Sequence, residues 1–143
     1  MIYQNDKNSL PIFKKAGCYY FSILKMCFDL FPGAGEFTML KAIQFYQEQI
    51  ADGQLDVRED MLIQDPQNLI DDLIGKGKLK FEGKFPVGFK PTEKEKVIDY
   101  WEFYRNGKLA GTHFTYGDYD PWYPASPWRL NGKLAGYRVF KVL

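Results

Sequence analysis

Apolar residues recur at helical spacing through the first half of the chain. Residues 17–31 are apolar on nearly every side of a helix, which predicts a helix buried in the middle of the fold. Residues 36–52 repeat apolar positions every three or four places, as an amphipathic helix does. A third, shorter helix is expected over 65–75, because Asp65 is a typical N-cap and Pro66 suits the first turn.

Beyond Gly77 the pattern changes from helical spacing to alternation, and glycine, proline, aromatic and β-branched residues dominate. The alternation predicts strands over residues 78–82, 97–105, 109–117 and 135–142. Two dipeptides, Asn106-Gly107 and Asn131-Gly132, are typical of two-residue hairpin turns and predict antiparallel pairing. N-terminal helices followed by a C-terminal antiparallel sheet make an α+β fold, with the first helix at its centre.

The composition narrows the class of protein. Of 143 residues, 45% are hydrophobic and 17% aromatic, which is enough for one packed core, so we expect a single domain over residues 1–143. Lys+Arg 19 and Asp+Glu 18 nearly cancel, so no overall field attracts the chain to nucleic acid or to an anionic membrane. No apolar run reaches the roughly 20 residues that span a bilayer, and no secretion signal is recognisable. We therefore expect a cytoplasmic protein without nucleic-acid or membrane partners.

The two cysteines, Cys18 and Cys27, fall on the same predicted helix. They would lie about 13 Å apart along its axis, too far for a disulfide, so both are expected to be free thiols. Cys18 follows Gly17 at the helix start, where the helix dipole favours a thiolate and free N–H groups can stabilise an oxyanion. A small buried apolar side chain is the other interpretation of Cys18, and it is the one we adopt for Cys27.

His113 is the only histidine, and it lies in an alternating segment where His113 and Thr115 share one face of the strand. Its imidazole can therefore face a neighbouring helix. Asp118 and Asp120 follow closely, and either carboxylate could orient the ring; we favour Asp120. The alternative is an ordinary hydrogen-bonded strand histidine followed by aspartates that form turns. One histidine and two cysteines on one helix do not make a zinc site, and no phosphate-binding motif is present, so we expect no metal and no cofactor.

The order of these parts resembles the papain-like cysteine peptidase superfamily. AGCYYFSILK opens the first predicted helix, and GTHFTYGD and YDPW follow in the sheet half. The chain looks closest to the compact bacterial branch that contains double-glycine leader peptidases, and to uncharacterised phage and prophage proteins. The resemblance implies a papain-like fold in which Cys18 is the nucleophile, His113 the base and Asp120 the residue that orients it. Relatives also place an oxyanion-stabilising glutamine shortly before the nucleophile, and the nearest upstream glutamine here is Gln4, with Asn5 and Asn8 as substitutes.

Together the residues and the resemblance predict a cysteine peptidase or amidase that cleaves a peptide, an isopeptide or a cell-wall amide, and that is phage- or prophage-encoded. Its partner would then be a peptide or protein substrate. The aromatic residues expected to line the cleft are Trp101, Tyr116, Trp122 and Tyr123. A different hypothesis keeps the same fold without catalysis, as a phage protein that sequesters a host protein or a small signalling molecule. A structural phage component is a third.

Overall fold

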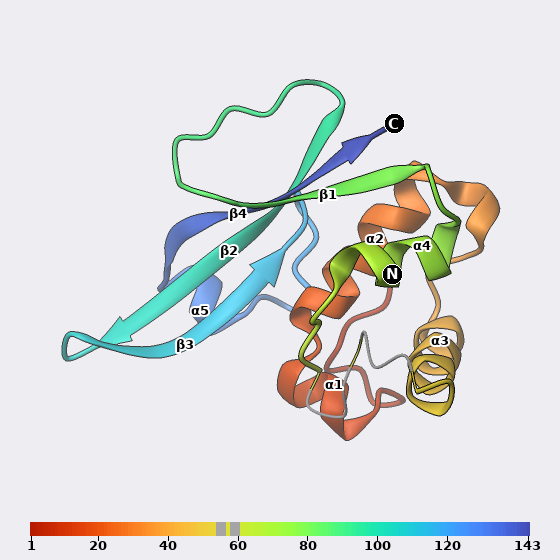
Figure 1. Cartoon of the computed structure of the whole chain (residues 1–143). Coiled ribbons are helices and arrows are strands. Elements are labelled where there is room, and N and C mark those ends of the chain that lie inside the picture. Colours follow the sequence, from red (N-terminus) through yellow and green to blue (C-terminus); the bar gives the residue numbers. More distant parts are fainter. Residues whose placement is uncertain (54–56, 58–60) are drawn as a thin grey trace.

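The structure is a computed structural model that describes residues 1–53, 57 and 61–143. Within these residues the chain combines helices with a four-stranded antiparallel sheet, so the predicted α+β class is confirmed. Figure 1 shows the helices α1 to α4 gathered beside the sheet, while the hairpin of β2 and β3 extends away from them. Strand order follows β1-β4-β2-β3, which leaves β3 at one edge.

The described helices are α1 (Pro11–Ala16), α2 (Cys18–Leu30), α3 (Met39–Ala51), α4 (Pro66–Ile74) and α5 (Pro127–Leu130), with a 3-10 turn, η1 (Pro32–Ala34), after α2. The described strands are β1 (Leu79–Phe85), β2 (Glu95–Arg105), β3 (Lys108–Thr115) and β4 (Lys133–Val142). No helix in the described part of the chain is both long enough and apolar enough to cross a membrane.

Helix α2 is buried as its all-round apolar sequence predicts, and only Asp29 is exposed. The core joins this helix to α3, α4 and the sheet, and its fully buried members include Phe21, Leu24, Leu69, Ile98 and Phe140. The N-caps of α3 and α4 explain where these helices begin: Thr38 accepts from the Lys41 N–H, and Asp65 from the Asn68 N–H.

The two predicted hairpin turns have different outcomes. Asn106-Gly107 joins β2 to β3 with both residues at positive φ, 54° and 76°, and the prediction is confirmed. The turn predicted at Asn131-Gly132 is wrong, because these residues lie between α5 and β4 and not between two strands. Ser126 and Pro127 begin a short helix just before them, with the Ser126 hydroxyl accepting from the Trp128 N–H.

Helix α1 was not expected from the polar N-terminal sequence. Pro11 occupies its first turn, and it ends at Gly17, whose N–H donates to the Phe13 carbonyl over 2.8 Å. So short a helix is stabilised by packing rather than by propensity, and Phe13 is completely buried. The segment 55–64, between the helices predicted over 36–52 and 65–75, falls in part outside the described residues; within it, Val57 and Ile63 form an antiparallel bridge.

Candidate active site

Gly17 places Cys18 at the N-terminus of α2. The Gly17 N–H donates to the Phe13 carbonyl, which is the last hydrogen bond of α1. The Gly17 carbonyl accepts the Phe21 N–H over 2.9 Å, which is the first hydrogen bond of α2. A Cβ at position 17 would lie 2.7 Å from the Phe13 oxygen, so only glycine fits between the two helices. Cys18 is therefore half-buried at a helix start, where the first N–H groups lack partners within the helix.

The edge strand β3 brings His113 to this helix end. Phe114 stacks on Tyr19, with ring centroids 4.4 Å apart, and so holds the strand against the first turn of α2. His113 is 3% exposed and lies opposite Trp101 of β2. Thr115, on the same face, accepts the Trp101 indole N–H over 3.0 Å. The imidazole is consequently fixed on a packed sheet surface.

A tight turn carries the chain back to His113. The backbones of Tyr116 and Tyr119 exchange two hydrogen bonds of 3.0 and 2.9 Å, and Gly117 takes a φ of 55° between them. The reversal returns Asp120 alongside the strand, and its Oδ1 lies 2.6 Å from His113 Nε2. The six residues between His113 and Asp120 are therefore enough to form a turn that brings these two side chains together.

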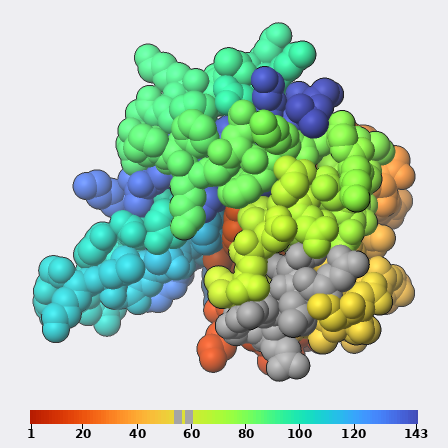
Figure 2. Space-filling model, viewed as in Figure 1, coloured from red at the N-terminus to blue at the C-terminus, as the bar shows by residue number. Residues whose placement is uncertain are grey.

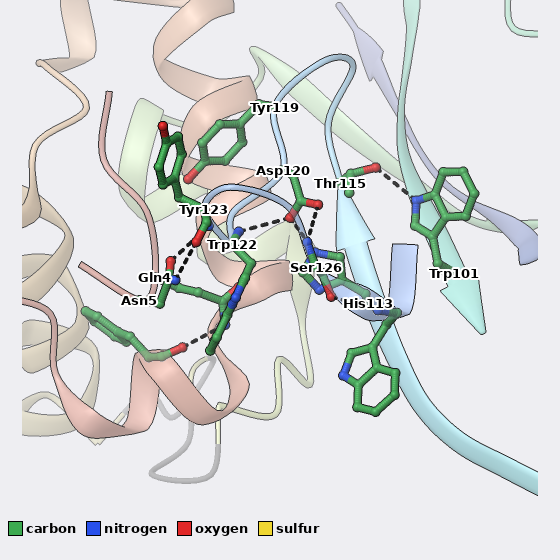
Figure 3. Close-up of polar contacts among 12 residues, drawn as sticks. Gln4, Asn5, Trp101, His113, Thr115, Tyr119, Asp120, Trp122, Tyr123 and Ser126 are labelled. Carbon is green, nitrogen blue, oxygen red and sulfur yellow. Dashed lines mark hydrogen bonds and ion pairs between the residues drawn. The ribbon is translucent and has the colours of Figure 1, made fainter. Parts of the chain in front are cut away.

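The carboxylate of Asp120 is held at both oxygens (Figure 3). Oδ1 also accepts the Trp122 N–H over 2.9 Å, and Oδ2 accepts the Ser126 N–H over 3.0 Å. Burial opposes ionisation of this group, but the hydrogen bonds from His113 and from the two backbone N–H groups, with the imidazolium charge, lower its pKa. Asp120 is therefore an ionised, rigid partner for the ring.

His113 is held in its protonated form. Burial by itself lowers the pKa of the imidazole, but the hydrogen bonds with Asp120 and Cys18 and the negative charges of both outweigh it, and the pKa rises to about 9. Because Nε2 is taken by Asp120, Nδ1 is left for the thiol. The other cysteine differs: burial raises the pKa of the Cys27 thiol to about 12, so Cys27 is inert core.

The N-terminal segment folds back along the loop that follows Asp120. The Gln4 N–H donates to the Pro121 carbonyl over 2.7 Å, and the Asn5 side chain both donates to and accepts from the Tyr123 backbone. Gln4 is thereby buried beside the site, and its side-chain Nε2 donates to the Phe13 carbonyl over 2.9 Å. Asn5 is occupied by its loop contacts and Asn8 is exposed, so of the three predicted amides Gln4 is the one that lies at the site.

Cys18, His113 and Gln4 share one cavity of about 260 Å³. Its other lining residues are Lys14, Lys15, Thr112, Trp122, Ser126, Pro127 and Trp128. Of the predicted cleft aromatics, only Trp122 lies here. Tyr116 and Tyr123 line a separate cavity, and Trp101 donates its N–H to Thr115 instead.

Asp118, the alternative orienting residue, is exposed and lines the separate cavity with Tyr116 and Tyr123. The structure thus brings Asp120 rather than Asp118 into contact with the ring. Among the described residues, no three His, Cys, Asp or Glu side chains cluster in a way that could hold a metal ion.

No protein-family model, curated protein or solved structure gives a significant match to this chain.

Two contributors to the site were missed from the sequence. Ser126 donates its N–H to Asp120, and Trp128 lines the cavity, where its ring lies so close to Gly111 that a Cβ there would meet it at 2.8 Å. The Ser-Pro pair before Trp128 is a recognisable helix start and would have predicted α5. No sequence signal points to the contact between Trp128 and Gly111.

Proposed function

We propose that this chain is a cysteine peptidase or amidase with a papain-like fold. One observation carries the proposal: the imidazole of His113 is held between the ionised carboxylate of Asp120 and the thiol of Cys18. The thiol also lies at a helix start and opens into a cavity, as a nucleophile requires. The resemblance of the sequence motifs to papain-like peptidases agrees with this geometry.

In the proposed reaction the Cys18 thiolate attacks the carbonyl carbon of an amide. A carbon–sulfur bond forms, and the carbonyl electrons move to the oxygen. His113 then gives its proton to the leaving nitrogen, the carbon–nitrogen bond breaks, and a thioester remains on Cys18. Water then attacks the carbonyl carbon of this thioester while His113 accepts a proton from the water. The carbon–sulfur bond breaks, which releases the acid and restores the thiolate.

Two groups are suited to stabilise the oxyanion. Backbone N–H groups in the first turn of α2 point out of the helix start, beside the sulfur. Gln4 offers the second donor, because its amide nitrogen carries two hydrogens and only one of these two is donated to the Phe13 carbonyl. The hydrogen bond from the Gln4 side chain to the Phe13 carbonyl of α1 holds this amide next to Cys18, the residue that begins α2.

Asp120 would act by orienting the ring rather than by taking the proton. Its bond to Nε2 fixes the imidazole with Nδ1 towards the sulfur, and its charge favours the imidazolium. Such an arrangement serves any amide, so the choice among peptide, isopeptide and cell-wall substrates depends on the cavities around the thiol.

Alkylation by iodoacetamide at pH 7, with each cysteine followed by mass spectrometry, tests the proposal. Cys18 is expected to react at least a hundredfold faster than Cys27, and His113→Ala should remove most of that advantage. Cys27→Ala is the control, since it removes a thiol without touching the site. Slow, equal labelling of both cysteines would favour the non-catalytic binding protein instead.

A direct assay then looks for turnover. Incubation with a peptide library derived from a bacterial proteome, followed by mass spectrometry of new termini, should reveal cleavage that Cys18→Ala abolishes. Cleavage that persists in Cys18→Ala would show that the nucleophile lies elsewhere.

A further inference from the structure

A second cavity, of about 490 Å³, opens on the other side of Cys18. It shares Lys15, Cys18 and Thr112 with the smaller cavity, so the sulfur lies where the two meet. Figure 2 shows a narrow hollow on this face between the cyan β2–β3 hairpin and the yellow-green segment that leads into α4, with red-orange atoms visible inside it. A substrate whose carbonyl lies at Cys18 can therefore extend into this cavity.

The charged residues that the structure describes around this cavity are all cationic. Its described lining residues include three cations, Lys15, Lys84 and Arg138, and no aspartate or glutamate. Most of the remaining lining is apolar or aromatic: Ala16, Tyr19, Met61, Leu62, Ile63, Pro66, Phe81 and Phe114. Cations above an apolar floor attract an anionic group more strongly than the same cations in open solvent would.

Arg138 is the best placed of the three cations. Its guanidinium lies over the rings of Tyr100 and Phe114, 4.8 and 5.2 Å from their centroids, and these rings restrict its motion. No carboxylate in the described part of the chain pairs with it. A guanidinium that is positioned but unpaired presents a planar pair of N–H donors, the arrangement that binds a carboxylate through two parallel hydrogen bonds.

We propose that this cavity binds a carboxylate of the substrate and that Arg138 is its main ligand, with Lys84 and Lys15 adding charge. The enzyme then prefers amides that carry a carboxylate close to the bond that is cleaved. This inference rests on the proposed function, since it takes the carbonyl to lie at Cys18. The carboxylate belongs either to an acidic side chain or to a chain end, and both present the same group to Arg138.

Three matched thiol reagents separate these possibilities. Bromoacetyl-glutamine amide is neutral, bromoacetyl-glutamic acid α-amide carries a side-chain carboxylate, and bromoacetyl-glutamine carries a terminal carboxylate. Each alkylates Cys18 by displacing bromide, so their relative rates measure recognition near the sulfur. We expect at least one acidic reagent to react with Cys18 five- to twentyfold faster than the neutral one, and the faster acid identifies the source of the carboxylate.

Arg138→Gln should reduce this advantage to twofold or less, and Lys84→Gln, at an exposed position, should reduce it in part. Arg105→Gln is the matched control, because Arg105 also stacks on an aromatic ring, Phe103, but does not line the cavity. Equal rates for all three reagents, or an advantage that survives both Arg138→Gln and Lys84→Gln, would overturn the inference while leaving rapid alkylation of Cys18 intact. If instead the proposed function is wrong, Cys18 reacts no faster than Cys27 with any of the three reagents.

Discussion

Asp120 Oδ1 lies 2.6 Å from His113 Nε2, and both side chains are buried. The same carboxylate accepts two backbone N–H groups from the loop that follows it. One carboxylate thus orients the imidazole and organises the loop that covers one side of the cavity. The structure of the loop and the electrostatics of the site are therefore coupled, and a change at Asp120 affects both.

Asp120→Asn keeps the size of the side chain but removes its charge and one acceptor. The variant should lower the pKa of His113 from about 9 towards 6.5, because the charge that favours the imidazolium is lost. Leaving the Ser126 N–H without its acceptor should lower the free energy of unfolding by about 1–3 kcal/mol. NMR titration of the imidazole and denaturant unfolding measure the two effects. Asp118→Asn, on the same turn, should change neither, and a His113 pKa unmoved in Asp120→Asn would contradict this account.

Stability should depend on pH through His113. Its pKa is 6.5 in the unfolded chain and about 9 in the folded one, so the folded state binds the proton more tightly. The stabilisation is complete below pH 6.5 and is lost as pH rises through 9, a loss of about 3 kcal/mol. Urea unfolding at pH 6 and pH 9.5 measures it. His113→Gln should show a correspondingly weaker dependence over that interval; an identical slope in both proteins would refute the assignment.

Gln4→Met tests whether the amide of Gln4 stabilises an oxyanion. Acylation of Cys18 by p-nitrophenyl acetate passes through a tetrahedral oxyanion, whereas alkylation by iodoacetamide does not. The variant should therefore acylate about ten- to a hundredfold more slowly and alkylate at an unchanged rate. Asn8→Leu, at an exposed position in the same segment, serves as the control. Equal losses in both reactions would indicate a general disturbance of the site and not a role for the Gln4 amide.

Gly17→Ala should lower the free energy of unfolding by about 1–3 kcal/mol, because the new methyl group would lie 2.7 Å from the backbone oxygen of Phe13. Relief would require α1 and α2 to move apart, so alkylation of Cys18 should also slow. Gly33→Ala is a suitable comparison, since nothing lies within 4 Å of its Cβ position. Denaturant unfolding of both variants checks the prediction, which fails if the two behave alike.

Much of the fold follows from local patterns in the sequence. All-round apolar residues predicted the buried helix α2, and the Asp65-Pro66 start predicted α4. Alternation predicted all four strands to within a few residues, and one Asn-Gly turn was correct. The hairpin turn predicted at Asn131-Gly132 was wrong because an Asn-Gly dipeptide is compatible with more than one local structure. Here the preceding Ser126-Pro127 pair begins a helix. Local rules cannot decide between two local signals that compete.

For the site, the sequence by itself determined which groups are available: one imidazole, one thiol at a helix start, and two aspartates in a turn. Only the tertiary structure decided that Asp120 and not Asp118 meets the ring, and that Gln4 lies beside the thiol. The pairing of Asp120 depends on the turn between Tyr116 and Tyr119, and the position of Gln4 depends on contacts between segments more than a hundred residues apart, such as Asn5 with Tyr123. Spacing along the chain carries no information on such contacts, because they arise from the packing of the whole core.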